Sequence, residues 1–293
     1  VPTYNPNNLN GVDEARRRNR ALTDLYEPGS TMKPVAAAIA LNSGKFKPTT
    51  VINTAPLRLG RATVKDSHYA GAMNVAKVIQ VSSNVGASKM ALSFKPQIYH
   101  DYLKSVGFGE RPTIVFPGAV RGRVRPWERW VPIEQATMSY GYGISVSLMQ
   151  MARAYTIFTS NGQLKPVSFL KQDKVPEGPQ ILLPETAKDM RWIMEKVTQP
   201  GGTATSARIP GYRVAGKTGT AHKLQGRGYA GNKYIGSFVG FAPVSNPRLI
   251  VAVMIDEPTA GGYYGGVVAA PVFKNVMKEA LRQLGVQPDA PSS

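Results

Sequence analysis

The sequence predicts an α+β fold in which an antiparallel sheet is flanked by helices. Apolar residues recur at helical spacing early in the chain, in its middle and at its end, whereas three consecutive segments near residues 212–255 are rich in β-branched and aromatic residues. Of the 293 residues, 42% are hydrophobic and 18% are charged, so the chain can bury a substantial core. We expect residues 1–293 to form one domain.

The helices are predicted from their apolar stripes and stop signals. An Ala-rich helix covers residues 32–42 and ends at Gly44. Three others follow from i, i+3, i+4 spacing, which places their stripes in the core: Leu148, Met151, Ala152 and Tyr155 before Asn161-Gly162; Met190, Ile193, Met194 and Val197 after Pro184; and Phe273, Val276, Met277, Ala280 and Leu284 before Gly285.

Three strands are predicted over residues 212–221, 234–242 and 249–255. The stretch from Pro243 to Pro247 joins the second and third strands as a hairpin-like turn. Consecutive strands with short connections favour antiparallel pairing.

Composition excludes several classes of site. Without cysteine, the chain has no Cys nucleophile, Cys-ligated zinc or disulfide. Its three histidines are scattered, so we expect neither a metal nor another cofactor. The sequence contains no run of about 18 apolar residues, the length that a membrane-spanning helix needs, and no signal peptide is evident. Because the chain starts at Val1 in mid-sequence, we expect a domain of a longer protein.

The net charge is +18, from 36 Lys and Arg against 18 Asp and Glu. Such a charge indicates either attraction to an anionic partner or simply a solvated basic surface. The basic residues are dispersed, apart from residues 16–18 and 121–129, and no nucleic-acid-binding signature accompanies them. We therefore expect no nucleic-acid partner.

Three short motifs stand in order along the chain. They are S-x-x-K at Ser30–Lys33, S-x-N at Ser82–Asn84 and K-T-G-T at Lys217–Thr220. Each motif is weak alone, and a second S-x-x-K begins at Ser168, but that copy follows the S-x-N motif and stands in the wrong order. The ordered trio is a known signature of acyl-serine enzymes.

The first motif is compatible with a nucleophile at a helix N-terminus. Pro34 is tolerated only in a first helical turn, so Ser30 is expected at the helix entrance, with Lys33 on the same face. A lysine whose pKa is lowered by burial and a neighbouring cation such as Lys217 can take the serine proton. Taken alone, the pattern equally suits an N-cap serine and a solvated lysine.

The other two motifs supply polar groups to the same reaction. Ser82 can relay a proton, and Asn84 can hold both a substrate amide and a lysine. Gly219 lets a peptide backbone approach the strand, while Lys217, Thr218 and Thr220 can receive a terminal carboxylate. The N–H groups of Ser30 and Thr220 are a candidate oxyanion hole. Taken alone, these motifs are also typical of a polar turn and of a strand entering a glycine turn.

The trio and its surroundings resemble class B penicillin-binding proteins, and most closely the cell-division-specific peptidoglycan D,D-transpeptidases. The supporting stretches cover nearly the whole chain: residues 4–8, 18–20, 27–34, 82–86, 140–143 and 263–266. The resemblance implies a five-stranded antiparallel sheet between helices, and a penicillin-binding domain that lacks here its N-terminal membrane anchor and pedestal domain. It also implies a bacterial inner-membrane protein with a periplasmic catalytic domain.

The resemblance assigns roles and partners as well. Ser30 would be the acylated nucleophile and Lys33 its base, with Ser82, Asn84 and Lys217 completing the network. Tyr142, Tyr263 and Tyr264 would line the cleft. The substrate would be a stem peptide ending in D-Ala-D-Ala, β-lactams would be covalent inhibitors, and divisome proteins including a lipid II polymerase would be partners.

Two residues depart from the family's pattern, and three functions other than transpeptidation are considered. His222 stands where relatives usually carry Arg or Lys, and Ala119 where an acidic residue is expected. A class A β-lactamase is disfavoured because no E-x-x-L-N segment lies between Ser82 and Lys217. A D,D-carboxypeptidase and a β-lactam sensor domain stay open.

Overall fold

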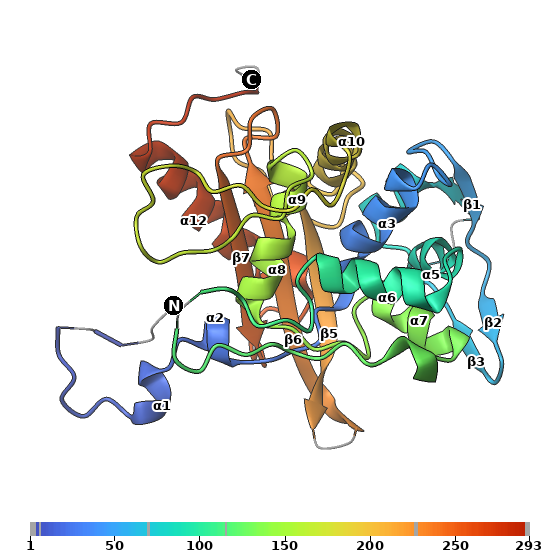
Figure 1. Cartoon of the computed structure of the whole chain (residues 1–293). Coiled ribbons are helices and arrows are strands. Elements are labelled where there is room, and N and C mark those ends of the chain that lie inside the picture. The colour runs from blue at the N-terminus through green and yellow to red at the C-terminus, as the bar shows by residue number, and fades with distance from the viewer. Residues whose placement is uncertain (1–3, 6, 69–70, 115, 226–227, 291–293) are drawn as a thin grey trace.

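The computed structural model describes residues 4–5, 7–68, 71–114, 116–225 and 228–290. The antiparallel sheet is formed by β5 (Ala215–Gln225), β6 (Gly228–Ala242) and β7 (Leu249–Asp256), in the order β5-β6-β7. Figure 1 shows α8 (Leu148–Ala154) across one face of this sheet and α12 (Ala270–Gln283) across the other. These layers confirm the predicted α+β class.

A mostly helical region lies beside the sheet (Figure 1). It contains α3 (Lys33–Asn42), α4 (Val75–Val81), α5 (Asn84–Leu92), α6 (Pro96–Ser105) and α7 (Pro132–Ser139), with the small antiparallel pairs β1 (Val51–Asn53) with β4 (Ala72–Asn74) and β2 (Leu57–Leu59) with β3 (Ala62–Val64). The remaining elements are short or peripheral: α1 (Glu14–Arg17), α2 (Arg20–Thr23), α9 (Thr156–Thr159), α10 (Pro184–Glu195) and α11 (Gly265–Val268), with 3-10 helices η1 (Gly29–Met32), η2 (Trp127–Arg129) and η3 (Thr205–Ala207).

The four predicted helices are present at their predicted places. Positive φ angles at Gly44, Gly162 and Gly285 mark the expected helix ends. The predicted strands are also present, but the first begins three residues later than predicted because Ile209 and Tyr212 close a tight turn before it. The second begins earlier, at Gly228, because the β5–β6 ladder extends past Tyr234.

The expected number of strands is wrong: the described residues form a three-stranded main sheet, not a five-stranded one. Residues 7–24, which precede the nucleophile motif, are rich in Arg and also in Asn and Asp, two residue types that are depleted in strands. They form turns, α1 and α2 instead, and are held near the sheet by side chains rather than by a backbone ladder.

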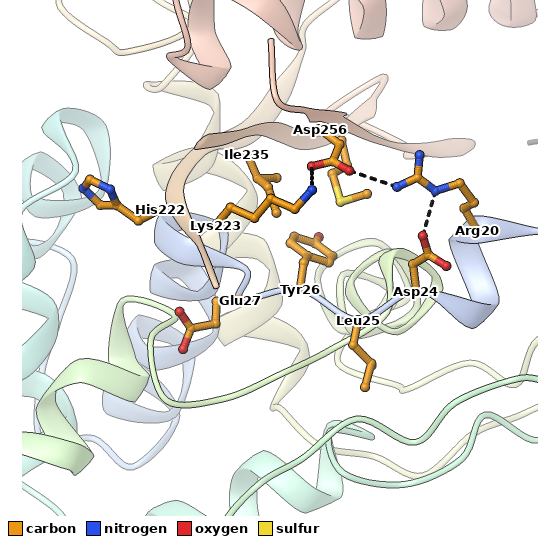
Figure 2. Close-up of a pocket in the computed structure, with 10 residues that line it drawn as sticks. Arg20, Asp24, Leu25, Tyr26, Glu27, His222, Lys223, Ile235 and Asp256 are labelled. Atoms are coloured by element: carbon orange, nitrogen blue, oxygen red, sulfur yellow. Dashed lines mark hydrogen bonds and ion pairs between the residues drawn. The ribbon is translucent and has the colours of Figure 1, made fainter. Parts of the chain in front are cut away.

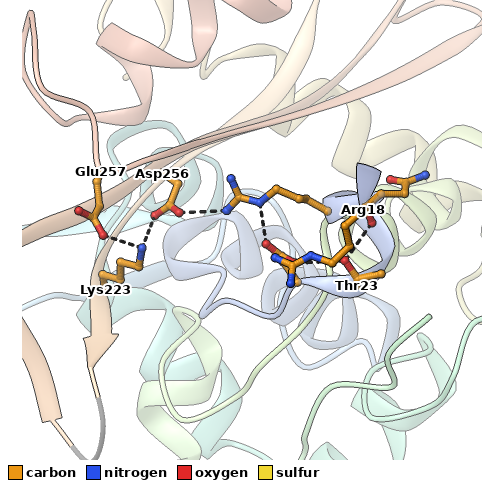
Figure 3. A network of polar contacts seen from close by, with 8 residues as sticks. Arg18, Thr23, Lys223, Asp256 and Glu257 are labelled. Atoms are coloured by element: carbon orange, nitrogen blue, oxygen red, sulfur yellow. Dashed lines mark hydrogen bonds and ion pairs between the residues drawn. The ribbon is translucent and has the colours of Figure 1, made fainter. Parts of the chain in front are cut away.

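Figure 3 shows the ion network that makes this connection. Arg20 bridges Asp24 at 2.7 Å and Asp256, the last residue of β7, at 3.0 Å, and Lys223 bridges Asp256 at 2.9 Å and Glu257 at 2.6 Å. Exposed pairs of this kind are each worth about 0–1 kcal/mol, so the network fixes the position of α2 more than it stabilises the fold.

Helix α12 contributes far more to stability through its buried face. Phe273 is fully buried, and its ring packs edge-on against Phe238 of β6 at 4.7 Å between centroids. Replacing Phe273 with Ala should lower the free energy of unfolding by about 3–5 kcal/mol, because it leaves a cavity between helix and sheet. Val276→Ala on the same helix, where Val276 is 48% exposed, should cost about 0.5 kcal/mol or less. Denaturant unfolding of both variants measures the difference; equal losses would contradict this packing.

Candidate active site

Ser30 lies in the first turn of a continuous helical run. The 3-10 helix η1 passes directly into α3, and the N–H of Lys33 donates to the Ser30 carbonyl. Pro34 occupies the first turn of α3, as predicted. Tyr155 stabilises the turn, because its buried hydroxyl donates to the Thr31 carbonyl at 2.7 Å. The serine is therefore presented at a fixed helix entrance.

Two buried lysines share one hydroxyl oxygen. Lys33 Nζ donates to Ser82 Oγ at 2.9 Å and to the Ser82 carbonyl at 2.5 Å, and Lys217 Nζ donates to the same Oγ at 2.9 Å. The lysines are 1% and 0% exposed. The three motifs, far apart in sequence, thus meet at Ser82.

Burial changes the protonation of both lysines. It lowers the pKa of Lys33 well below its usual value, with Lys217 lowering it further and Asp66 opposing the shift. Burial also lowers the pKa of Lys217 to about 7. Because a desolvated site disfavours two adjacent ammonium groups, a neutral amine is available near neutral pH, as a general base requires.

Ser82 itself has an uncommon backbone. It ends α4 with φ 67° and ψ 46°, in the left-handed region, where non-glycine residues are rare. The next residue, Ser83, caps α5 by accepting the Gly86 N–H at 2.9 Å. The sharp turn between the two helices directs Ser82 Oγ at the lysines, an example of strain located at a functional group.

Asn84 makes a different contact from the one predicted. Its carboxamide nitrogen donates to the backbone carbonyl of Lys65 at 3.1 Å, and none of its described hydrogen bonds reaches the amine of Lys33 or Lys217. Asp66, which sequence reasoning missed, takes part instead by accepting the Ser83 hydroxyl at 2.5 Å and the Val85 N–H at 2.9 Å. Asp66 follows the end of β3 by two residues, and a lone aspartate at such a place carries no sequence signal of this role.

On β5 the K-T-G-T motif presents alternating faces. Lys217 faces Ser82, whereas Thr218 Oγ1 lies 2.8 Å from Thr203 Oγ1, and the two hydroxyls extend the polar cluster. Lys217 Nζ also donates to Thr218 Oγ1 at 3.2 Å. The Thr220 hydroxyl is engaged by the Gly265 N–H at 3.2 Å. Thr203 is a second polar residue that the motifs did not indicate.

The glycine of that motif is required by the protein's own packing. A Cβ on Gly219 would lie 2.3 Å from Ser237 Oγ and 2.9 Å from the Pro28 carbonyl. A side chain there would push residues 28–32, the turn that carries Ser30 and that we call the nucleophile turn, away from β5. A Cβ on Gly29 would lie 3.3 Å from the Thr220 carbonyl, which therefore faces that turn. In antiparallel strands a residue's N–H and C=O point to the same side, so the Thr220 N–H faces the turn as well. This is the geometry that the proposed oxyanion hole needs.

The three predicted cleft tyrosines belong to one row of rings. Consecutive centroids are 3.9–6.1 Å apart along Tyr140, Tyr142, Tyr229, His222, Tyr234, Tyr263 and Tyr264. His222 thus packs among tyrosines, and Figure 2 shows its ring directed away from the Glu27 carboxylate. Within the described residues His222 has no ion pair, and its ring contacts are with Tyr229 and Tyr234.

Ala119 also has a structural explanation. It is 6% exposed in a small apolar cluster with Leu22 and Ile114. A carboxylate at this position would be desolvated without a partner, which is costly.

Glu27 is a further residue that the motifs missed. It is 6% exposed; its Oε1 accepts the Gly143 N–H at 2.8 Å, and no hydrogen bond of standard length reaches Oε2 within the described residues. Beside it, the Gly29 N–H donates to the Gly141 carbonyl at 3.2 Å, and Tyr26 pairs with Val146. Glu27 therefore fastens the segment before Ser30 to residues 141–146.

A cavity of about 340 Å³ lies next to Glu27 (Figure 2). None of the three motifs' residues lines it; its walls are formed by Arg20, Asp24, Leu25, Tyr26, Glu27, His222, Lys223, Ile235, Met254 and Asp256. Within the described residues, no three His, Asp or Glu side chains converge as a metal site.

Comparisons with known proteins agree with this geometry. The family model of the penicillin binding protein transpeptidase domain matches residues 1–278. The chain is 51% identical over 292 residues to the probable peptidoglycan D,D-transpeptidase PenA of Neisseria flavescens, covering 100% of this chain and 73% of that protein. It is 40% identical over 289 residues to the peptidoglycan D,D-transpeptidase FtsI of Escherichia coli K12, covering 99% of this chain and 49% of FtsI.

A solved structure is similar over nearly the whole fold. The apo transpeptidase domain of Burkholderia pseudomallei penicillin-binding protein 3 superposes with a TM-score of 0.90 at 48% identity, covering 94% of this chain and 84% of that one. The chain thus spans about half the length of the E. coli relative and most of this solved domain.

The Glu27 contact gives a prediction with two parts. In Glu27→Ala the Gly143 N–H loses its acceptor, which should cost about 1–3 kcal/mol of unfolding free energy. Glu27→Gln keeps an acceptor oxygen and should cost less. Burial raises the pKa of Glu27, and the Gly143 N–H opposes this shift. The contribution of Glu27 to the stability of the wild type is therefore fully present below its unfolded pKa, and it is lost as pH rises through its folded pKa.

The Gln variant has no such titration. Denaturant unfolding from pH 4 to 8 should therefore show Glu27→Gln gaining on the wild type as pH rises. The exposed Glu128→Gln is the matched control and should track the wild type. A Gln variant that falls further behind at higher pH would refute the buried carboxylate.

Proposed function

We propose the following reaction for this chain, which belongs to the penicillin-binding protein transpeptidase domain family: Ser30 takes the acyl group of a peptidoglycan stem peptide ending in D-Ala-D-Ala and passes it to an acceptor amine. The observation that carries the proposal is the Ser82 Oγ shared by two buried lysines, 2.9 Å from each. A candidate proton acceptor three residues after Ser30 in the same helical run, in contact with a candidate proton relay, supports acyl transfer by that serine.

In the first half-reaction, Ser30 Oγ attacks the carbonyl carbon of the penultimate D-Ala. The serine proton moves to the neutral amine of Lys33, one helical turn away. The negative charge on the carbonyl oxygen is met by the N–H groups of Ser30 and Thr220. The C–N bond then breaks, and the leaving D-Ala amine receives a proton from the lysine pair through Ser82.

In the second half-reaction, the acceptor amine attacks the ester carbonyl. The C–O bond to Ser30 breaks, and the amine's proton returns to the serine oxygen through the same groups, so the enzyme ends in its starting state. The donor's terminal carboxylate lies near Lys217 and Thr218, and its backbone pairs with β5, which has one unpaired edge within the described sheet. β-Lactams open on Ser30 and leave an acyl-enzyme.

The cellular setting follows from the sequence resemblance. We propose that the chain works in septal cell-wall synthesis with divisome partners that include a lipid II polymerase. Its place would be the periplasmic face of the inner membrane. None of the described helices is both long and apolar enough to cross a bilayer.

Intact mass after penicillin treatment tests the nucleophile. The wild type should gain the mass of one drug molecule, and Ser30→Ala should gain none. Ser168→Ala, in the second S-x-x-K sequence, is the control and should be acylated like the wild type. An adduct that persists on Ser30→Ala would mean that another residue is the nucleophile, and rapid loss of the wild-type adduct with drug hydrolysis would favour a β-lactamase.

The pH dependence of acylation tests the base. Because burial lowers the pKa of both lysines, that of Lys217 to about 7, the acylation rate should rise from pH 5 and level off well below pH 10. Lys33→Arg cannot lose its proton and should lower the rate by about 10²–10⁴-fold. Stopped-flow acylation gives both results, with Lys45→Arg as an exposed control. A rate that keeps rising to pH 10.5 would exclude a buried lysine as the base.

A further inference from the structure

Arginines occupy every second position of the extended segment 121–125. Arg121 and Arg123 are exposed, whereas Val124 between Arg123 and Arg125 packs into the core. Gly122 has φ 67°, and a Cβ there would lie 2.2 Å from the Ser145 carbonyl, so the backbone at this point leaves no room for a side chain. We call residues 121–125 the arginine segment.

The arginine segment lies close to the nucleophile turn through one intervening segment. Arg123 exchanges backbone hydrogen bonds with Ser145 at 2.8 and 3.1 Å, and the neighbouring Val146 exchanges two with Tyr26 at 2.9 and 3.0 Å. Adjacent extended segments are about 4.8 Å apart, so the arginine segment lies about 10 Å from the residues that lead into Ser30. Both are within reach of one peptide.

Two of these guanidinium groups are free to bind an anion. Arg125 pairs with Glu134 at 2.6 Å, and its Nη2 lies 3.6 Å from the Cβ position of Gly143. In the part of the chain that the structure describes, Arg121 and Arg123 have no carboxylate within ion-pair distance. The segment therefore presents an uncompensated positive charge beside the catalytic turn.

The chemistry of transfer indicates which anion this is. The proposed function requires two stem peptides: the donor, whose remaining backbone stays paired with β5 after D-Ala and its carboxylate have left, and an acceptor, which is a second copy of the same kind of peptide and carries carboxylates of its own. The acceptor must reach acyl-Ser30 while the β5 side is filled. Guanidinium groups pair with carboxylates through two parallel hydrogen bonds.

We propose that Arg121 and Arg123 bind the carboxylates of the acceptor stem peptide. This assignment rests on the proposed function and adds to it the place from which the second peptide approaches. It also gives a specific use to part of the +18 charge, beyond a solvated basic surface.

The test measures how tightly the protein binds insoluble peptidoglycan. The protein is first treated with penicillin, which blocks Ser30 and fills the donor site. The wild type should bind native peptidoglycan more tightly than peptidoglycan whose carboxyls have been amidated. Arg121→Gln/Arg123→Gln should weaken binding to the native polymer about fivefold, the effect expected of two exposed ion pairs. The difference should disappear near 1 M salt, where charges are screened beyond about 3 Å.

Lys171→Gln/Lys174→Gln removes the same charge from an exposed loop and should bind like the wild type. Equal weakening of both double variants would overturn the proposal, because net charge alone would then explain retention. Binding of the arginine double variant at wild-type strength, or equal wild-type binding to native and amidated polymer, would overturn it too. The penicillin adduct, measured by mass on the same samples, tests the acyl-serine function separately.

Discussion

The site depends on two amines that are both removed from water. A buried ammonium is costly, and two that share one hydroxyl oxygen at 2.9 Å each are costlier still. Two features offset this cost. Ser82 and nearby carbonyls accept hydrogen bonds from the two amines, and one amine gives up its charge near neutral pH. The same desolvation that weakens the folded state is what makes a lysine a usable base.

Three parts of the chain must meet to create that condition, and glycines set how closely they approach. Gly29, Gly141 and Gly219 all lie where a Cβ would come within 3.3 Å of a neighbouring backbone carbonyl. The nucleophile turn is therefore packed between β5 and residues 141–146, and at these glycines there is no room for a further side chain. Two hydrogen bonds fasten it: Glu27 accepts the Gly143 N–H, and the Tyr155 hydroxyl donates to the Thr31 carbonyl. A rigid turn of this kind keeps Ser30 positioned without help from a substrate.

Much of this could be predicted from the sequence, because local signals are strong there. Pro34 fixed the helix entrance, and the period change near residue 212 indicated consecutive strands. The number of strands was wrong because it came from resemblance, and the Asn- and Arg-rich start of this chain forms turns. Glu27, Asp66 and Thr203 could not be found, since single polar residues gain meaning only when folding brings distant backbone groups to them. The partner of Asn84 was missed for the same reason.

The unpaired edge of β5 has a consequence for the protein as a whole. An open edge strand invites pairing with any other chain, including another copy of itself, and so promotes aggregation. Here the nucleophile turn packs against that edge at Gly219 and Thr220, and Lys217 on the same strand contacts Ser82 at the junction between α4 and α5. Part of the edge is therefore covered by the protein's own chain, which leaves less of it open to a second sheet. The contacts that organise the chemistry thereby also limit self-association.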